Sequence, residues 1–500
     1  MPILSCRSIL FAAKKYSVVG DVEDVDAVVV GGGISGSTTA FYLQEKGINS
    51  VLAEIKTELG GNIISKKKNG FLWEEGPNSF QPNNNILRLA RDLDMLPELV
   101  LSNPNAPRYV FWDGKLHALP MSLSGLYDTK LLSCNGIGRA LFGAMGFISP
   151  KPILEESVKD FFIRHLGEEI FQRVIDPFIS GVYAGDPSKL SIGAALPKIK
   201  SIEDGTFTGS ILEGFLKKMF SKSVESIDSN LDSTFANLPK IPSGSLGSFS
   251  NGLQSVPLRI RDYLGGGTVR LSHELIQLRR EDSHWISTFK TPEGEKTFRS
   301  KAVLLTTPAF VSSHLLQGIS DRVTEAAKGL NQIVYPPVAS VTLAYPSDAF
   351  MQDLDGFGHL IPRKMGVRTL GTIWSSSLFP GRAPDGYSML LNYIGGAQDV
   401  NIKSLSTEEI ARQVHADLKQ ILLKRYAPEP IILGVRLWNK AIPQYDKGHL
   451  SLIQNIESAL EADAPGLFLG GSCKSGIAFG DCVKNGAEFA DVLGVYLMSQ

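Results

Sequence analysis

One stretch constrains what this chain can fold into more than any other: a run of valines, then three consecutive glycines, then a helix-like segment. It reads DAVVVGGGISGSTTAFYLQEKGINSVLAEI over residues 26–55. The valines at 28–30 are β-branched and apolar, which predicts a fully buried parallel strand. Residues 34–46 predict a helix that ends at Gly47, and residues 50–54 predict a second strand. The stretch therefore predicts a strand, a glycine turn, a helix and another strand in succession.

The glycine turn has the spacing Gly31-x-Gly33-x-x-Gly36, which is typical of dinucleotide-binding proteins. The first glycine makes the tight turn, and the second lets backbone amides approach a pyrophosphate at the positive end of the helix. The third keeps the helix close to the sheet. The spacing alone is a weak signal because glycine turns are common, but here both strands and the helix accompany it. The residues predicted to bind a dinucleotide here are Gly31, Gly32, Gly33, Ile34, Ser35 and Gly36.

An acidic residue, Glu54, ends the second predicted strand, 18 residues after Gly36. A carboxylate there can accept hydrogen bonds from both hydroxyls of an adenosine ribose, and it would repel a 2′-phosphate. The structural alternative is an exposed carboxylate at a strand end. Because the glycine turn precedes it, we interpret Glu54 as a ligand of the ribose.

A second glycine-rich junction lies near the C-terminus, about 420 residues after the first. There APGLFLGGSCKSGIAFGDCVKNGAEF runs from an apolar strand through glycines into a helix. NAD needs little beyond one glycine turn, whereas FAD is extended and needs a second backbone cradle near its ribityl and flavin end. The two junctions therefore favour FAD over NAD. The predicted second cradle consists of Gly470, Gly471, Gly476, Ile477, Ala478 and Gly480.

Composition limits the partners and the compartment. Lys and Arg number 50 against 51 Asp and Glu, so the formal net charge is −1 and no global field favours a nucleic acid. The four cysteines form no CxxC or zinc spacing, and we expect free thiols in a reducing compartment. No stretch reaches the ~18 apolar residues that suggest a spanning helix, so contact with a membrane would be at its surface.

The remaining pattern divides the chain into strand-rich and helical regions. Residues 83–220 have helical periodicity broken by prolines and glycines, which predicts a helical insertion rather than a continuation of the sheet. Residues 268–309 alternate like antiparallel strands and end in a buried run at 302–305. VASVTLAY, GFGHLIP, TLGTIWSS and YSMLLNYIGG predict a second sheet that extends to about residue 394. Lys68-Asn69-Gly70 predicts the turn of a hairpin.

With these stretches in view, the chain resembles the protoporphyrinogen oxidases, flavoenzymes that aromatise protoporphyrinogen IX, and it is more similar to the plant plastid type than to the mitochondrial type. The resemblance runs from about residue 26 to 495. The glycine turn alone would identify only the broad superfamily of flavin amine oxidases and desaturases. The stretches that narrow it are WEEGPNSFQP, DPFISGVYAGDP, LGTIWSSSLFPGRAP, LLNYIGG and WNKAIPQY.

The resemblance implies a fold of α/β plus α+β class. Its parts are a Rossmann-type FAD domain of the para-hydroxybenzoate hydroxylase kind, a mixed-sheet substrate domain and a helical membrane-binding insertion. Residues 1–24 are basic before Asp21 and resemble an organelle-targeting leader or its stub, with a disordered overhang as the alternative. The expected segments are 25–95, FAD-binding segment 1; 96–220, helical membrane-binding and substrate insertion; 221–248, linker loop; 249–312, FAD-binding segment 2; 313–437, substrate-binding domain; and 438–500, FAD-binding segment 3.

Further cofactor contacts follow from the resemblance. Many relatives carry a basic residue after the glycine pair at 60–61 to meet the FAD pyrophosphate, but Asn62 stands there, as in plastid-type members. Charge neutralisation must then come from backbone dipoles or elsewhere. Trp438 is expected to pack near the flavin, and a core tryptophan is the alternative. The additional cofactor residues implied are Gly60, Gly61, Asn62, Gly76, Pro77, Asn78, Ser79, Leu275 and Trp438.

The implied substrate has apolar faces and two propionates, so its site should be large and apolar with one or two cations. By resemblance, Arg108 meets a propionate as a bidentate donor, and Leu360, Leu370 and Tyr393 sandwich a pyrrole. Mitochondrial-type members have Phe in place of Tyr393, whose hydroxyl therefore needs a partner. The backbone near Gly181 is expected to approach the reacting edge of the substrate, where a side chain would collide. The alternative for Arg108 is an exposed strand arginine. The alternative for Leu360, Leu370 and Tyr393 is ordinary sheet core.

The sequence carries no Ser-His-Asp set, metal-binding cluster or paired-carboxylate motif, so we name no protein general base and no metal. A flavin can accept hydride at N5, while pyrrole N–H acidity and imine–enamine shifts redistribute protons in the macrocycle. The resemblance implies oxidation of protoporphyrinogen IX to protoporphyrin IX in three two-electron steps. Dioxygen is the acceptor and hydrogen peroxide is released, in the biosynthesis of haem and chlorophyll.

The resemblance also implies association with a membrane surface in the plastid, with the mitochondrion as the alternative. It leaves open a homodimer and handover of the product to ferrochelatase or magnesium chelatase. Two other functions stay open on the residues. One is an amine oxidase or carotenoid desaturase of the same superfamily, which an aromatic cage or a long tunnel would favour. The other is a non-catalytic flavin- or NAD-binding protein whose insertion docks on a membrane.

Overall fold

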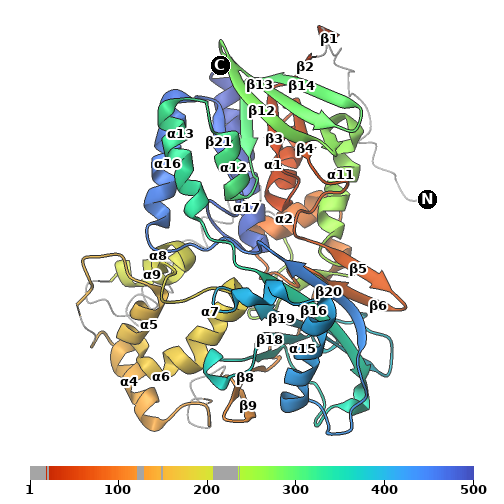
Figure 1. Ribbon diagram of the computed structural model, residues 1–500, viewed down its shortest axis with the longest axis vertical. Coiled ribbons are helices and arrows are strands. Elements are labelled where there is room, and N and C mark those ends of the chain that lie inside the picture. The colour runs from red at the N-terminus through yellow and green to blue at the C-terminus, as the bar shows by residue number, and fades with distance from the viewer. Residues whose placement is uncertain are drawn as a thin grey trace.

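The computed structural model describes residues 18–19, 22–120, 125, 129–147, 150–206, 235 and 237–500. Most of the expected leader and the first part of the expected linker lie outside these residues. Of the cysteines, Cys134, Cys473 and Cys482 are free thiols, as expected, and Cys6 lies outside the described residues. Figure 1 shows two lower lobes, one helical and one built on a sheet, beneath an upper α/β lobe.

The upper lobe is built on a parallel five-stranded sheet in the order β11-β4-β3-β15-β21. Three distant stretches of chain supply its strands, and β3 is buried at every residue, as the valine run predicted. The helix α1 packs against α17 and α11 on one face. The bounds are β3 (Ala27–Val30), β4 (Ser50–Glu54), β11 (Val269–Leu271), β15 (Ala302–Leu305), β21 (Leu467–Leu469), α1 (Ile34–Glu45), α11 (Ser255–Thr268) and α17 (Phe479–Met498).

A second sheet, in the order β1-β2-β14-β13-β12, covers the other face together with three helices, and their apolar side chains form one core cluster. The antiparallel strands predicted within residues 268–309 are confirmed, except that β11 joins the parallel sheet. The bounds are β1 (Val18–Val19), β2 (Val22–Asp24), β12 (Glu274–Glu281), β13 (His284–Thr291), β14 (Gly294–Ser300), α12 (Ala309–Leu315), α13 (Asp321–Lys328) and α16 (His449–Asp463).

The lower right lobe in Figure 1 is a seven-stranded sheet in the order β20-β16-β19-β18-β17-β8-β9. The four strands predicted from VASVTLAY, GFGHLIP, TLGTIWSS and YSMLLNYIGG are confirmed as β16 to β19. The helix α15 covers one face and contributes to a separate apolar core. The bounds are β8 (Arg108–Trp112), β9 (Lys115–Ala118), β16 (Val338–Pro346), β17 (Gly358–Leu360), β18 (Thr369–Trp374), β19 (Tyr387–Gly395), β20 (Ile431–Trp438) and α15 (Thr407–Ile421).

The lower left lobe in Figure 1 is helical, which confirms part of the prediction that residues 83–220 form a helical insertion. The prediction was wrong for residues 108–118, because β8 pairs in parallel with β17 and so extends the sheet. The left-handed Asp113 and Gly114 make the hairpin turn between β8 and β9. The described helices of this lobe are α4 (Cys134–Ala144), α5 (Val158–Leu166), α6 (Glu168–Ile170), η2 (Phe171–Ile175), α7 (Asp176–Tyr183), α8 (Ile192–Ala195) and α9 (Pro197–Asp204).

Short elements connect the lobes. The predicted hairpin is confirmed, since Asn69 and Gly70 have φ values of 51° and 80° between β5 and β6. In the described part of the chain, no helix combines the length and apolarity that crossing a membrane requires. The remaining bounds are β5 (Ser65–Lys68), β6 (Phe71–Glu74), β7 (Leu99–Leu101), β10 (Gly247–Phe249), α2 (Asn84–Asp92), α14 (Ser375–Leu378), η1 (Leu96–Glu98), η4 (Gly329–Gln332), η5 (Ser347–Ala349), η6 (Arg363–Met365) and η7 (Val400–Ser404).

Candidate functional site

The first glycine turn has the tight geometry that its spacing predicts. Gly31 has a φ of 109°, which a residue with a side chain rarely adopts. A Cβ on Gly36 would collide with the Gly31 carbonyl, so α1 can approach the end of β3 only with glycine there. A Cβ on Gly32 would likewise collide with Leu59. Protein geometry alone therefore requires three of the four glycines.

Gly33 is different, because a Cβ there would meet no atom of the described protein within 4 Å. Gly33 is also the N-cap of α1, and no side chain caps that helix end. The first amides of a helix have no partner within the helix, and they carry the positive end of its dipole. The amides of Ile34 and Ser35 belong to this first turn. The space beside Gly33 and these amides fit a pyrophosphate.

Glu54 is buried at the carboxyl end of β4, next to the glycine turn. Its two carboxylate oxygens accept hydrogen bonds from the Gly32 amide at 2.6 Å and from the Lys56 amide at 2.9 Å. The backbone thus fixes the carboxylate, and its remaining lone pairs suit hydroxyl donors. Leu275 was also predicted to contact the cofactor. Its side chain is buried in the apolar core between the two upper sheets.

The glycine pair at 60–61 lies against the first turn. The Gly60 amide donates to the Gly32 carbonyl at 2.8 Å, and a Cβ on Gly61 would lie 3.2 Å from the Cα of Gly33. Asn62 is exposed beside them. The ammonium of Lys56 donates to the Gly61 carbonyl at 2.8 Å, which places a cation where the basic residue of many relatives is missing. Sequence reasoning missed Lys56, although its place two residues after Glu54 was a usable signal.

Thr306 joins the two glycine-rich junctions, which lie side by side at the carboxyl ends of β3, β15 and β21. Its hydroxyl is within hydrogen-bond distance of the carbonyls of Val30, at 3.0 Å, and Gly31, at 2.9 Å. On its other side, a Cβ on Gly471 would lie 3.0 Å from the Thr306 carbonyl, and Gly471 has a φ of 80°. The Gly470 amide donates to the Leu305 carbonyl. Both cradles therefore face one edge of the parallel sheet.

The rest of the second cradle leads into α17. Gly476 has a φ of 68°, and a Cβ on it would collide with Asp481. Ala478 is the N-cap of α17, and again no side chain caps the helix end. Ile477 packs against the apolar cluster of the helical lobe. The second cradle thus lies where the helical lobe meets the upper lobe.

The loop Gly76-Pro77-Asn78-Ser79 connects the upper lobe to the seven-stranded sheet. The Tyr393 hydroxyl donates to the Gly76 carbonyl at 2.8 Å. The Glu75 carbonyl accepts from Ser340 at 2.7 Å and from the Trp438 indole at 2.8 Å. Asn78 is buried, and its side-chain nitrogen has no hydrogen-bond partner among the described residues. A buried unpaired donor in this loop fits a polar ligand on the cofactor side.

A buried ion pair strengthens the same junction. Glu74 accepts from Arg382 at 3.2 Å, from Ser65 at 2.6 Å and from the Leu253 amide at 3.0 Å. Arg382 also donates to Ser248 at 2.6 Å. Burial raises the pKa of Glu74 although Arg382 lowers it, and burial lowers the pKa of Arg382. Sequence reasoning missed this pair, whose members are 308 residues apart.

The predicted substrate residues lie on neighbouring strands of the sheet. Leu360 on β17 is opposite Gly371 on β18, which is opposite Tyr393 on β19. A shift of register between Thr369 and Gly371 makes room for Leu370, which clusters with Ala184, Tyr393 and Trp438. The structure therefore brings Leu370, Tyr393 and Trp438 together.

Gly181 in α7 closes this region from the helical lobe. A Cβ on Gly181 would lie 2.6 Å from Leu360 Cδ2, so α7 approaches the end of the Leu360 side chain closely here. Arg108 begins β8 opposite Gly358, two residues before Leu360. Its guanidinium donates to the Gly244 carbonyl at 3.3 Å and lies 5.7 Å from the Phe357 ring centre. Neither of these two described contacts of the Arg108 side chain is made with a carboxylate.

His359 is the histidine that adjoins this region in the chain. His359 neighbours Leu360, but it pairs with Thr372, and its ring lies 6.1 Å from that of Trp374 in the core under α15. Burial lowers the pKa of His359 to about 3, so the imidazole stays neutral. Among the described residues, no group of three or more His, Cys, Asp or Glu is placed to hold a metal ion.

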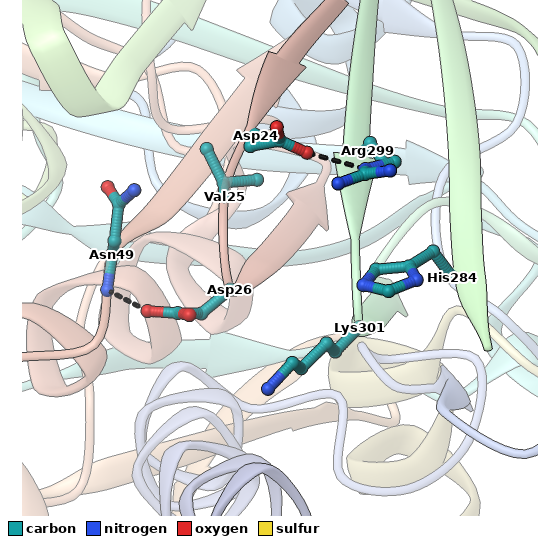
Figure 2. Close-up of a pocket in the computed structure, with 7 residues that line it drawn as sticks. All are labelled: Asp24, Val25, Asp26, Asn49, His284, Arg299 and Lys301. Carbon is teal, nitrogen blue, oxygen red and sulfur yellow. Dashed lines mark hydrogen bonds and ion pairs between the residues drawn. The ribbon is translucent and has the colours of Figure 1, made fainter. Parts of the chain in front are cut away.

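Figure 2 shows a pocket of about 240 Å³ at the opposite, amino-end edge of the parallel sheet. Arg299 pairs with Asp24 at 2.6 Å, and Asp26 accepts from the Asn49 amide at 2.9 Å. Val25 and Asp26 directly precede β3, whereas both glycine junctions follow the carboxyl ends of their strands. This pocket is therefore separate from the candidate cofactor site.

Fold and site together define a dinucleotide-binding α/β protein with an added sheet domain. Residues 34–493 match the family model described as "Flavin containing amine oxidoreductase", and the chain belongs to that family. It is 43% identical over 483 residues to "Protoporphyrinogen oxidase 1, chloroplastic" of Arabidopsis thaliana, covering 94% of this chain and 88% of the relative. It is also 43% identical over 488 residues to the protein of that name from Spinacia oleracea, covering 94% and 85%. The chain is an FAD-dependent oxidoreductase of this family.

Solved structures share the fold. A crystal structure of a protein from Exiguobacterium sp. 255-15 has a TM-score of 0.74 at 23% identity, covering 95% of this chain and 99% of that one. Cyclohexylamine oxidase from Brevibacterium oxydans has a TM-score of 0.64 at 16% identity, covering 95% and 100%. These comparisons agree with the predicted fold of a Rossmann-type FAD domain with a mixed-sheet domain and a helical insertion.

Proposed function

We propose that this protein oxidises protoporphyrinogen IX to protoporphyrin IX with dioxygen as the electron acceptor. The observation that carries the proposal is the junction at Gly76. There the loop of the predicted cofactor site is hydrogen bonded to Tyr393, which shares an apolar cluster with Leu370 and Trp438. Leu360, Leu370 and Tyr393 form an apolar surface, here called the platform, that directly adjoins the cofactor loop. Such a platform suits a large apolar macrocycle. Relatives 41–43% identical to this chain bear the name of this activity.

Tyr393 and the two leucines hold the macrocycle in this proposal. The Tyr393 hydroxyl is committed to Gly76, which fixes the plane of the ring. Burial raises the pKa of Tyr393, so the hydroxyl remains a protonated donor and not a base. Leu360 and Leu370 then supply apolar surface beside the ring, and they exclude water from the face of the substrate.

Arg108 binds one propionate in this proposal. Its place two residues before Leu360 on the neighbouring strand puts a cation at the margin of the apolar platform. A guanidinium can meet a carboxylate with two parallel hydrogen bonds, which orients the macrocycle as well as attracting it.

When bound, FAD would supply the hydride acceptor and the route of the electrons to dioxygen. The Gly33 turn, Glu54 and the Gly471 cradle hold it, and Trp438 restricts it through an indole fixed to the Glu75 carbonyl. The protein positions the reacting carbon, and we assign no described residue as the base. Proton loss then depends on the acidity of the pyrrole N–H groups and on solvent.

The helical lobe contacts a membrane surface in this proposal, and residues roughly 109–220 supply that surface. Phe147 is 69% exposed and Leu154 is 82% exposed in the segment after α4, and residues 148–149 between them lie outside the described chain. Lys151 in the same segment pairs with Asp204 at 2.7 Å, so apolar contact is the main attraction. Other exposed apolar side chains of this lobe are Leu141, Phe142, Met145, Ile153, Phe178 and Val182.

Flotation with liposomes tests the membrane contact. The wild type should float without detergent, and Phe147→Glu should float less, while Tyr426→Glu, at an exposed position in the other lower lobe, should float like the wild type. Equal flotation of the two variants would contradict this surface. A plastid location is proposed from the chloroplastic names of the relatives. A homodimer and handover to ferrochelatase or magnesium chelatase are proposed from the resemblance alone.

The proposed activity is tested with two substrates in parallel. One curated relative, 28% identical, is the "Coproporphyrinogen III oxidase" of Bacillus subtilis. Porphyrin fluorescence should therefore be followed in air with protoporphyrinogen IX and with coproporphyrinogen III. A higher kcat/KM for protoporphyrinogen IX supports the proposal, and a higher value for coproporphyrinogen III would redirect it to the substrate with more carboxylates.

A further inference from the structure

The loop that follows β20 joins all three parts of the molecule. The Ala441 amide donates to the Pro336 carbonyl at 3.1 Å beside β16. The Tyr445 carbonyl accepts from the Ser191 amide of the helical lobe at 2.8 Å. The Tyr445 hydroxyl donates to the Ser472 carbonyl, next to the second glycine cradle. Because this loop is hydrogen bonded to all three parts, it can transmit a shift of one lobe to the others.

Gln444 is the polar side chain that this loop sends to the end of α7. It is 4% exposed. Its side-chain nitrogen donates to the Tyr183 carbonyl at 2.9 Å and to the Ile442 carbonyl at 3.0 Å, and its backbone amide donates to the Val334 carbonyl. Two carbonyls accept from one nitrogen, which fixes the orientation of the amide. The glutamine therefore serves as a double donor.

The backbone that Gln444 holds is strained. Tyr183 ends α7, and the next residue, Ala184, is buried with a φ of 48°. A residue with a Cβ in this left-handed region persists only when its surroundings enforce it. The Ala184 carbonyl accepts from the Ala397 amide at 2.7 Å. A Cβ on Gly185 would collide with the Gln444 side-chain oxygen, so glycine at 185 leaves the space that the amide needs.

This turn forms one wall of the proposed substrate site. Ala184 belongs to the apolar cluster that contains Leu370, with Tyr393 and Trp438 packed against it. Gly181, in the last turn of α7, touches Leu360. A shift of the Tyr183–Gly185 backbone would therefore move the surface opposite Leu360, Leu370 and Tyr393.

We propose that Gln444 is a positioning residue for the substrate site, acting through the Tyr183 carbonyl and the left-handed turn at Ala184. The proposal rests on the proposed function, because the wall in question is a wall of that site. It predicts that losing the donor raises KM for protoporphyrinogen IX and weakens binding of protoporphyrin IX. The kcat should change little, because the described hydrogen bonds of Gln444 go to Tyr183, Ile442 and Val334 and not to Leu360, Leu370, Tyr393 or a glycine turn.

Gln444→Glu tests the proposal through the direction in which KM changes with pH. A protonated carboxyl has nearly the shape of the amide and can donate one hydrogen bond to the Tyr183 carbonyl, whereas an ionised one cannot donate and faces two carbonyl oxygens. Burial would raise the pKa of this new carboxyl. The ratio of the variant's KM to the wild-type KM should be near one at low pH and should rise about tenfold as pH increases through that pKa. Gln420→Glu, exposed on α15, is the matched control and should stay near one throughout.

The second variant is Gly185→Ala, in which the new methyl displaces the amide. It should raise KM by a similar factor but without the pH dependence, and the flavin spectrum should match the wild type. The same order of effects should appear in Kd for protoporphyrin IX, measured by quenching of tryptophan fluorescence, which needs no turnover.

The outcomes separate the two proposals. A wild type that binds FAD but turns over no protoporphyrinogen IX contradicts the proposed function. If the wild type is active and the KM ratio of Gln444→Glu is flat with pH, the positioning role is overturned. Should Gln444→Glu fold too poorly to assay, a wild-type KM and Kd in Gly185→Ala would overturn it equally.

Discussion

The hydroxyl of Tyr393 donates a hydrogen bond of 2.8 Å to the carbonyl of Gly76. The two residues are 317 positions apart, and they join the seven-stranded sheet to the loop that precedes α2. Because Gly76 belongs to the predicted cofactor loop and Tyr393 to the predicted substrate platform, one contact links the two functions. A Cβ on Gly76 would collide with the Asn62 carbonyl, so only glycine lets the loop pack this closely against Asn62.

Removing this hydroxyl should loosen the junction without destroying it. Tyr393→Phe keeps the ring and loses one hydrogen bond, worth about 0.5–1.5 kcal/mol of stability. We expect a lower Tm, easier loss of FAD and a modest rise in KM, with most of kcat retained. Tyr426→Phe, at an exposed position, is the control and should change none of these. An unchanged Tm and unchanged FAD retention in Tyr393→Phe would show that the contact contributes nothing.

Arg108 should act in binding and not in electron transfer. Arg108→Ala removes the proposed partner of a propionate, at a cost of about 2–5 kcal/mol that appears mainly as a higher KM. The flavin spectrum and much of kcat should remain. Arg108→Lys should recover only part, because a point charge replaces a bidentate donor. A wild-type KM with a collapsed kcat in Arg108→Ala would assign the residue to the chemical step instead.

Lys56 should support FAD binding through its charge. Its ammonium is bonded to the Gly61 carbonyl beside the glycine turn, and it is exposed, so salt should screen its effect. We expect Lys56→Met to weaken FAD binding by about two- to fivefold at low salt and less at high salt. Titration of the apoprotein with FAD measures this. Lys67→Met, on the exposed strand β5, controls for loss of charge, and equal weakening in both variants would exclude a local role.

Breaking the buried pair of Glu74 and Arg382 by changing one partner should cost more stability than replacing both partners with uncharged residues. Arg382→Met leaves a buried carboxylate without its partner, at about 3–5 kcal/mol, whereas Glu74→Gln with Arg382→Met should cost much less. Glu325→Gln, which breaks an exposed pair with Lys328, should cost about 0–1 kcal/mol. Urea unfolding measures these variants and Glu74→Gln alone, and costs of the two single variants that add up to the cost of the double variant would contradict the coupling.

The pH dependence of Arg382→Met follows from the raised pKa of Glu74. A carboxyl whose folded pKa lies above its unfolded value binds its proton more tightly when folded. Its contribution to stability is therefore fully present below the unfolded pKa and is lost as pH rises through the folded one. Loss of Arg382 raises that folded pKa further. The variant should be closest to the wild type in acid and most destabilised at neutral pH and above, and the opposite trend would contradict this electrostatic account.

Local patterns predicted the local structure well. The valines of β3, the turn at Gly31 and the Asn69-Gly70 hairpin are each determined by neighbours within a few residues, so the sequence is enough to predict them. Long-range pairing was harder to predict. PRYVFWDGKLHA has the pattern of a hairpin, but nothing in it indicates that β8 pairs with β17 about 250 residues later.

The site followed the same division. Tyr393 needed a hydroxyl partner on physical grounds, and the structure supplies the Gly76 carbonyl. Thr306 lies between the two glycine junctions, yet a single threonine after a buried strand has no pattern that would mark it. Gln444 and Arg382 act through partners in other lobes, and such contacts depend on how the lobes pack. The ligand roles of the predicted residues stay predictions until they are measured.

The most direct measurement of the central claim is the stoichiometry of the reaction. The purified, FAD-loaded protein is mixed with protoporphyrinogen IX in a closed oxygen-electrode cell, and porphyrin fluorescence is recorded together with dioxygen consumption. We expect a rate well above that of spontaneous oxidation, with three molecules of dioxygen consumed for each protoporphyrin IX formed. A rate no higher than the protein-free control, or porphyrin formed without dioxygen consumption, would contradict it.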